Sequence, residues 1–254
     1  MKGTIAFTVA DANNMKYADK LVKSFKYFHP DIPIRVFGDS EIRKTKDKDI
    51  FYKQKPYFAN ILFNEGFEAC LGLDADQIIL GKLDYIFDNK DYDVGTVLNF
   101  NPLDFRTYGA ITINGVHAPT EYYNAGLVMM RSHKFVKHWL NLCNSKYFSR
   151  FTYKEQDLLN IMCHFGEYVV RCFDDADDFA HYYSWHGLLA SREALKMQIV
   201  NDEVYLAAQP DGYPSRDIIV KVYHAAMGQT TFDKLNYRLI FNEEVIAYID
   251  KILK

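Results

Sequence analysis

The sequence lacks the cysteine patterns that mark disulfide frameworks and structural zinc sites. Its 254 residues contain four cysteines, Cys70, Cys143, Cys163 and Cys172, with no CxxC pair and no regular spacing. Small disulfide-stapled domains and zinc modules carry such patterns. We therefore expect reduced core thiols and a cytoplasmic protein.

Long apolar runs are also absent. The N-terminal stretch MKGTIAFTVADANN has too few consecutive apolar residues for a signal peptide. No window of about 18 uninterrupted apolar residues is present to form a membrane-spanning helix. We expect a protein that is soluble or at most peripheral to a membrane.

The sequence has little excess of either sign of charge and few runs of like charge. The formal net charge of -3 is too small to steer a charged partner. The nearest thing to a charge run, RKTKDKD at 43–49, has the composition of a solvated loop rather than of a nucleic-acid footprint. These features argue against DNA or RNA binding.

Hydrophobic and aromatic residues, in contrast, are plentiful. They make up 49% and 16% of the chain, which argues against disorder and favours a large core and a ligand cleft lined by rings. No internal repeat or Pro/Gly-rich linker divides the sequence. We expect a single domain over residues 1–254.

Strand-like and helix-like segments alternate along the chain. Residues 3–9 and 32–38 have strand character and flank a helix, a unit whose crossover makes the two strands parallel. Pro56 opens another helix, and Gly66 stands at its C-terminal cap position. Further strands are expected at 69–73, 92–98, 126–130, 168–173 and 217–224, and further helices at 132–144 and 155–166. This alternation predicts a doubly wound α/β sheet.

Two acids, Asp74 and Asp76, directly follow the buried strand 69–73. Residues i and i+2 of an extended segment point the same way, and ligands of open α/β sheets bind at the carboxyl ends of strands. Two unpaired carboxylates beside a buried strand would repel, so we expect a cation between them. Carboxylate oxygens suit Mg²⁺ or Mn²⁺, which keep positions open for phosphate oxygens.

Four motifs in a fixed order carry a family resemblance: GLDADQIIL, YYNAGLVMMRSHKF, EQDLLN and VYHAAMG. Together they resemble the GT-A glycosyltransferases, most closely family 8, the retaining galactosyl, glucosyl and glycogenin-like enzymes, over about residues 3–228. The resemblance implies a GT-A fold, an α/β single domain with a Rossmann-like, mostly parallel mixed sheet flanked by helices. It also implies a nucleotide-binding half at about 1–98 and a half for acceptor and donor sugar at about 99–254.

The resemblance implies a metal site made of Asp74, Asp76 and His224, with Mn²⁺ or Mg²⁺ as cofactor. Asp74 and Ala75 would also contact the nucleotide sugar, and Asp76 would take part in catalysis. HAAMG departs from the family pattern H-x-x-G by one extra residue, and the usual Lys-Pro-Trp is absent. Lys234 is a candidate for the missing cation. The alternative for His224 is a hydrogen-bonded histidine at a strand end.

The first strand resembles the family's uridine-binding turn, where backbone and an acid meet the base and a tyrosine stacks on it. By position this implicates Ala10, Asp11 and Tyr17, although Tyr17 could simply pack on its helix. Lys55, with Lys53 nearby, matches a basic residue that contacts the donor phosphates or sugar. Loop lysines are otherwise usually solvated.

Asn124, Ala125 and Gly126 match the donor-sugar contact of the family, where glycine permits a close approach. Glu155 stands where the family has an aspartate bonded to the donor sugar, and Gln156 lies on the face where a nucleophile is expected. The resemblance therefore implies catalytic roles for both. A turn and a polar first helical turn are the structural alternatives. Segments 99–123 and 174–190 have the character of loops over a cleft.

The implied activity is transfer of a hexose from a UDP-sugar to a glycan or other hydroxyl acceptor, with retention. A divalent cation would neutralise the charge on the departing diphosphate. Two alternatives stay open: an inactive nucleotide-sugar- or carbohydrate-binding protein of the same fold, and a sugar nucleotidyltransferase. The second needs a Gly-rich loop after the first strand, and VADANNMKY contains no glycine.

Overall fold

The computed structural model of the chain describes most of its residues. These are residues 2–45, 47, 49–98, 100–101, 106–107, 112–113, 116–117, 122–173, 180–183, 197–207, 217–225, 237–239 and 241–254.

A six-stranded mixed sheet forms the centre of the molecule, in the order β11-β5-β10-β3-β1-β2. Its strands are β1 (Lys2–Val9), β2 (Ile34–Phe37), β3 (Phe67–Leu73), β5 (Val94–Leu98), β10 (Tyr123–Met130) and β11 (Val170–Cys172). β1 runs parallel to β2 and β3, and β11 runs parallel to β5, whereas β10 is antiparallel to both of its neighbours. The expected mostly parallel mixed sheet and the parallel first unit are confirmed.

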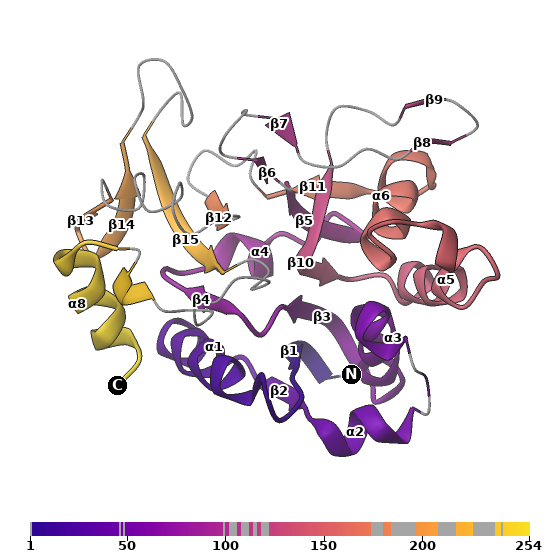
Figure 1. Cartoon of the computed structure of the whole chain (residues 1–254), viewed down its shortest axis with the longest axis horizontal. Coiled ribbons are helices and arrows are strands. Elements are labelled where there is room, and N and C mark those ends of the chain that lie inside the picture. Colours follow the sequence, from indigo (N-terminus) through magenta and orange to yellow (C-terminus); the bar gives the residue numbers. More distant parts are fainter. Residues whose placement is uncertain are drawn as a thin grey trace.

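Helices cover both faces of this sheet (Figure 1). They are α1 (Met15–Phe28), α3 (Gln54–Asn64), α5 (His133–Cys143) and α6 (Glu155–Phe165). Successive side chains of a strand point to opposite faces, so Ile5 and Phe7 pack in one cluster with α3 and α5, while Ala6 packs in another with α1. The sheet is therefore buried on both sides, as an α/β fold requires.

A second sheet lies beside the first and was not predicted. It contains β4 (Gln77–Ile79), β12 (Ala180–Tyr183), β13 (Gln198–Val200), β14 (Glu203–Leu206) and β15 (Ile218–His224). The expected strand at 217–224 is present as β15, but it pairs with β4, β12 and β14 rather than with the main sheet. Helix α8 (Glu243–Ile252) packs on this sheet through Val245, Ile249 and Ile252.

The remaining described elements are short. They are α2 (Asp39–Lys44), α4 (Asp84–Asp88), the 3₁₀ turns η1 (Ile50–Tyr52), η2 (Phe148–Arg150) and η3 (Tyr237–Leu239), and the hairpins β6 (Phe100–Asn101) with β7 (Arg106–Thr107) and β8 (Thr112–Ile113) with β9 (Val116–His117).

Local sequence explains the bounds of α3. Pro56 lies in its first turn, where no intrahelical N–H is needed, and Gly66 follows its end with φ +95. Both predictions for this helix are confirmed, although it begins two residues before Pro56.

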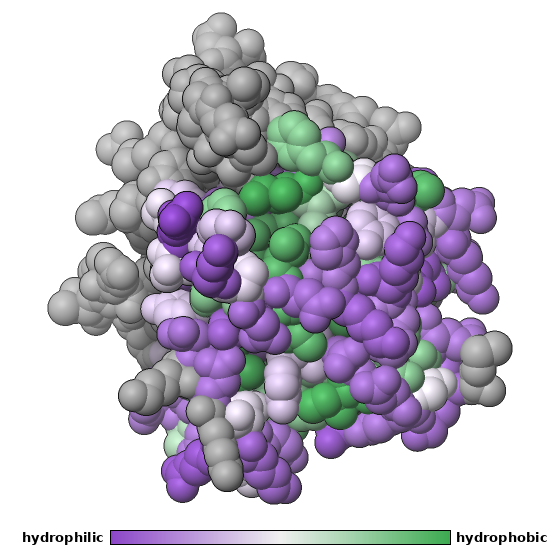
Figure 2. All heavy atoms as spheres, turned by 90° about the vertical axis from the view of Figure 1, so that its right-hand side faces the viewer, coloured by the Kyte–Doolittle hydropathy of each residue, from purple (hydrophilic) through white to green (hydrophobic). Residues whose placement is uncertain are grey.

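Hydrophilic side chains dominate the face that carries α5 and α6, and hydrophobic side chains gather in a patch on its upper part and in smaller patches near its lower edge (Figure 2). None of the helices in the described part of the chain combines the length and apolar character needed to cross a bilayer. All four cysteines are free thiols.

Candidate active site

Asp74 and Asp76 lie where the chain passes from the first sheet to the second. β3 ends at Leu73, Ala75 and Asp76 form a turn, and β4 begins at Gln77. The Asp74 amide donates to the Gly126 carbonyl (2.8 Å), and the Asp76 carbonyl accepts from the Ala225 amide (2.9 Å). Each acid is thus tied to a different sheet. The two carboxylates converge because the chain turns between the sheets, not because an extended segment persists through Ala75.

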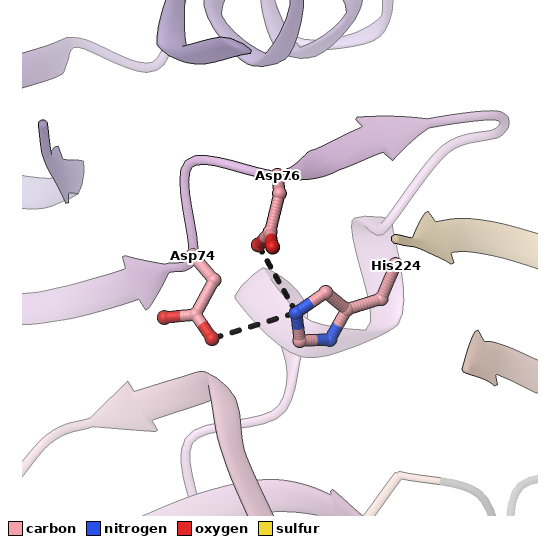
Figure 3. Close-up of side chains that lie close together, drawn as sticks. All are labelled: Asp74, Asp76 and His224. Carbon is pink, nitrogen blue, oxygen red and sulfur yellow. Dashed lines mark ion pairs between the residues drawn. The ribbon is translucent and has the colours of Figure 1, made fainter. Parts of the chain in front are cut away.

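His224 completes the cluster from the last position of β15. It pairs with Gln77 across the second sheet, and its Nε2 lies 3.2 Å from Asp76 Oδ1 and 3.5 Å from Asp74 Oδ2 (Figure 3). One ligand atom from each of the three residues lies within 4.8 Å of the others. Two carboxylates and an imidazole form a donor set that suits Mn²⁺ or Mg²⁺. The three predicted metal ligands therefore come together and fit a divalent ion.

The charges of this cluster support one another. Burial alone would raise the pKa of Asp74, but the charges of Lys55 and His224 outweigh it and hold that pKa well below its usual range. Burial alone would lower the pKa of His224, but hydrogen bonds and charges of Asp74 and Asp76 raise it to about 9. In the metal-free protein, cationic groups of the chain itself balance the two carboxylates.

Lys55 and Lys53 have different surroundings, although they are two residues apart. Lys55 is buried, and its Nζ forms an ion pair with Asp74 Oδ1. Lys53 Nζ lies 3.0 Å from Asp47 and 5.0 Å from the centre of the Phe148 ring. Only Lys55 of this pair belongs to the acidic cluster.

The segment Asn124–Gly126 lies at a bulge in β10. Along β5 the pairing advances from Val97 to Thr96, while along β10 it advances from Asn124 to Val128. The buried Thr96 hydroxyl lies 2.8 Å from the Asn124 carbonyl and 3.0 Å from the Leu127 carbonyl, to which it can donate. Bulges of this kind re-aim side chains next to functional sites.

Helix α6 holds the same bulge from the other side. Gln156 Oε1 accepts from the Ala125 amide (2.9 Å). Asn160 Oδ1 accepts from the Tyr123 amide (2.6 Å), and its Nδ2 donates to the Tyr123 carbonyl (2.9 Å). Asp157 accepts from the Tyr122 hydroxyl. The polar first turns of α6 therefore fix the backbone of Tyr123 and Ala125 and the side chain of Tyr122.

Gly126 has a specific steric role in this arrangement. A Cβ at this position would lie 2.4 Å from His224 Cε1 and 2.5 Å from Asn124 Oδ1. The Asn124 Oδ1 in turn accepts from the Gly126 amide (2.6 Å). The close approach expected at Gly126 is thus made by the side chains of His224 and Asn124. Because Gly126 has no side chain, the bulge lies directly against His224, a candidate metal ligand.

Glu155 begins α6, and its carboxyl is partly buried close to the same charges. Burial raises the pKa of Glu155 to about 8, the charge of Lys55 opposes that rise, and the charge of Asp74 adds to it. Its carbonyl accepts from the Trp139 indole N–H (3.0 Å), which anchors the start of the helix. Glu155 therefore lies within electrostatic reach of the acidic cluster.

Two of the three residues expected to bind the base, Ala10 and Asp11, lie at the same edge of the sheet. β1 and β3 run parallel with Phe7 opposite Gly72, so Ala10 and Asp11 leave the sheet near Asp74. Ala10 is buried, and Asp11 Oδ1 accepts from the Asn14 amide (2.9 Å) in the turn before α1. Their contact with a base stays a prediction.

Tyr17 lies on α1 and is buried in an apolar cluster. Its side chain is 8% exposed and packs in the apolar cluster that contains Ile78 and Leu80, with Lys16 Nζ 4.9 Å from the ring centre. This packing accounts for its burial. Stacking of a base on Tyr17 stays a prediction, and it requires that the base can reach the buried ring.

Some expectations fall outside the described residues. These are Gly228 and Lys234 after His224, and most of the segments 99–123 and 174–190. Thr96 and Asn160, in contrast, are described residues of the site that the sequence did not indicate. A polar residue inside the run VGTVL was the available signal for Thr96, and the i, i+4 spacing of Gln156 and Asn160 on α6 was the signal for Asn160.

Comparison with known proteins adds evidence on the fold. No family model matches the chain, and no curated protein matches it. The galactosyltransferase LgtC, solved with donor and acceptor sugar analogues, aligns over 98% of this chain and 95% of its own, with a TM-score of 0.57 and 16% identity. The bifunctional glycosyltransferase WbbM aligns over 99% of this chain and 50% of its own, with a TM-score of 0.60 and 13% identity.

The chain has the GT-A fold of these glycosyltransferases. The glycosyltransferase GlyE of Streptococcus pneumoniae also aligns, over 100% of this chain and 62% of its own, with a TM-score of 0.54 and 13% identity. The chain thus spans nearly the whole of LgtC but only about half to two thirds of the other two. The predicted GT-A fold is confirmed.

Proposed function

We propose that the protein is a metal-dependent glycosyltransferase, most similar to family 8, that transfers a hexose from a UDP-sugar to a hydroxyl of a glycan or glycoconjugate. The observation that carries this proposal is the meeting of Asp74, Asp76 and His224 at the strand ends of a GT-A fold. The two acids lie in the connection between β3 and β4, whereas the histidine ends β15, a long stretch of sequence away. A structural acidic turn does not require the histidine.

Asp74, Asp76 and His224 are the residues that would hold Mn²⁺ or Mg²⁺. When bound, the ion would supply positive charge to the departing diphosphate. Lys55, beside Asp74, offers a further cation to the phosphates. Ala10 and Asp11 would receive the uracil at the neighbouring strand end, with Tyr17 as the candidate for stacking.

The bulge Asn124–Gly126 would bind the donor sugar, because it lies against His224 and is held in place by α6. Glu155, with its raised pKa, is suited to share a proton with a sugar hydroxyl. Gln156 is a weak nucleophile, and its amide oxygen already accepts from Ala125. This supports retention by attack of the acceptor hydroxyl on the face that the diphosphate leaves, with a phosphate oxygen accepting the hydroxyl proton.

The site combines both proposed halves of the chain. Residues 1–98 supply the acids and Lys55, while residues 99–254 supply the bulge and His224, which supports a division into a nucleotide half and a sugar half. The four free thiols support a cytoplasmic location.

A panel of nucleotide sugars tests the proposal. UDP-sugars should raise the melting temperature of the protein when Mn²⁺ is present and not when EDTA replaces Mn²⁺. A ligand stabilises the folded state only when it binds to that state. Mass spectrometry of the same mixtures should show slow release of UDP from the bound donor. Stabilisation without any hydrolysis or transfer would identify a binding protein, and equal stabilisation in EDTA would contradict the metal site.

A further inference from the structure

Lys55 forms an ion pair with Asp74, a carboxylate that a metal ion at this site would also use. The two carboxylate oxygens of Asp74 have different partners. Oδ1 pairs with Lys55 Nζ, and Oδ2 lies 3.5 Å from His224 Nε2. The Lys55 side chain is 4% exposed, so little water is available to its ammonium group. A buried ammonium without a counter-charge is strongly unfavourable, which makes Asp74 essential to Lys55 in this state.

The position of Lys55 follows from the start of α3. Lys55 is the second residue of that helix, and Pro56 follows it, so the backbone that carries the side chain is restricted. The side chain of Lys53 instead pairs with Asp47, away from the cluster. The same short segment therefore contains one lysine committed to the site and one that is not.

We propose that Lys55 is an internal counter-ion that holds Asp74 while no divalent cation is bound and releases it when one binds. This inference rests on the proposed metal site. Because the ammonium and a divalent ion compete for the same carboxylate, Lys55 weakens metal binding in the absence of nucleotide. Once released, Lys55 needs a new anion, and the diphosphate of the donor is the anion that arrives at this edge of the sheet.

The exchange couples the two ligands. A bound diphosphate offers the released Lys55 a partner, so the nucleotide strengthens metal binding, and by thermodynamic reciprocity the metal strengthens nucleotide binding. Lys55 would thereby disfavour the state in which the metal ion is bound but the donor nucleotide is not. Replacing Lys55 by glutamine removes both effects together: the competition in the absence of nucleotide and part of the gain in its presence.

Calorimetric titration of Mn²⁺ into wild type, Lys55→Gln and Lys53→Gln, with and without saturating UDP, tests the exchange. Without UDP, Lys55→Gln should bind Mn²⁺ about fivefold tighter or more, and Lys53→Gln should match wild type. UDP should tighten Mn²⁺ binding more in wild type than in Lys55→Gln. Unchanged or weaker Mn²⁺ binding by Lys55→Gln would overturn the proposal, as would an equal effect of UDP on both proteins.

A metal-free double-mutant cycle separates this inference from the proposed function. Unfolding free energies of wild type, Lys55→Gln, Asp74→Asn and the double variant in EDTA should show a favourable coupling between the two side chains. Lys55→Met replaces Lys55→Gln if the latter does not fold. Absence of coupling overturns the counter-ion role whatever the protein does with metals. Coupling in a wild type that binds no Mn²⁺ would overturn the proposed function and, with it, the exchange.

Discussion

The candidate site has a charged side and an amide side, and the two are built differently. The charged side consists of Lys55, Asp74, Asp76 and His224, joined by ion pairs between α3, the end of β3 and β15. The amide side consists of the bulge Asn124–Gly126 and the side chains that hold it, Thr96, Gln156 and Asn160. Its hydrogen bonds are between neutral groups and do not change with ions.

This difference indicates a division of roles. The charged side can exchange partners, because each of its carboxylates has a cationic neighbour that a metal ion could replace. The amide side is a fixed template, because its buried amide and hydroxyl groups have few alternatives to their present partners. Gly126 is where the two sides touch.

Adding a methyl group at this contact should have the largest effect on stability. Gly126→Ala places Cβ against the His224 ring and the Asn124 side chain, so we expect a loss of about 3 kcal/mol in unfolding free energy, the upper end for overpacking. It should also abolish Mn²⁺-dependent stabilisation. Gly3→Ala is the control, because a Cβ at Gly3 meets nothing within 4 Å. Equal unfolding free energies of the two variants in urea denaturation would contradict the close packing of His224 and Asn124 against Gly126.

Removing a hydroxyl should weaken the amide side alone. Thr96→Val deprives the carbonyls of Asn124 and Leu127 of a buried donor and should cost about 1–3 kcal/mol in unfolding free energy. Thr96→Ser keeps the donor and should lose less. Because the Thr96 hydroxyl bonds to the carbonyls of Asn124 and Leu127, and Gly126 lies against His224, Mn²⁺ affinity measured by calorimetry should fall less than in Gly126→Ala. A larger loss for the serine variant would show that the methyl group, not the hydroxyl, matters.

Glu155→Gln should make the stability of the protein less dependent on pH, with its smallest effect near pH 5. Below the ordinary glutamate pKa of 4.5 both the folded and the unfolded state carry the Glu155 proton, and above about 8 neither does. Between these values only the folded state is protonated, so this group makes stability fall as pH rises. Glutamine cannot titrate. In EDTA, the melting temperature of Glu155→Gln relative to wild type should rise from pH 5 to about pH 9, and a constant difference would contradict the raised pKa.

Much of the fold could be predicted from local sequence. The strand at 3–9, its following helix and the strand at 32–38 have clear periodicity, and Pro56 and Gly66 mark the two ends of α3. The second sheet could not be predicted in the same way. β4 is only three residues long, and its apolar run contains no signal that its partner is β15, far along the chain.

The candidate site likewise contains residues that the sequence predicted and residues that it did not. Asp74, Asp76 and His224 were predicted, because strand ends and motif order point to charged groups. Two of the side chains that hold the bulge, Thr96 and Asn160, were not. Thr96 bonds 28 residues away to Asn124, and Asn160 bonds 37 residues away to Tyr123. A single polar residue in an apolar segment does not reveal a partner at that distance.

The central claim is that Asp74, Asp76 and His224 form a metal site for a nucleotide, and Asp76→Asn tests it most directly. Asparagine keeps the shape of the side chain and removes a ligand charge, and Asp74 still faces His224, so the metal-free variant should fold and melt within about 4 °C of wild type. Asp84→Asn, which removes a carboxylate 3.8 Å from His29 outside the site, is the control. Calorimetry of UDP in Mn²⁺ should show binding by wild type and the control and none by Asp76→Asn; unchanged binding by Asp76→Asn would contradict the account.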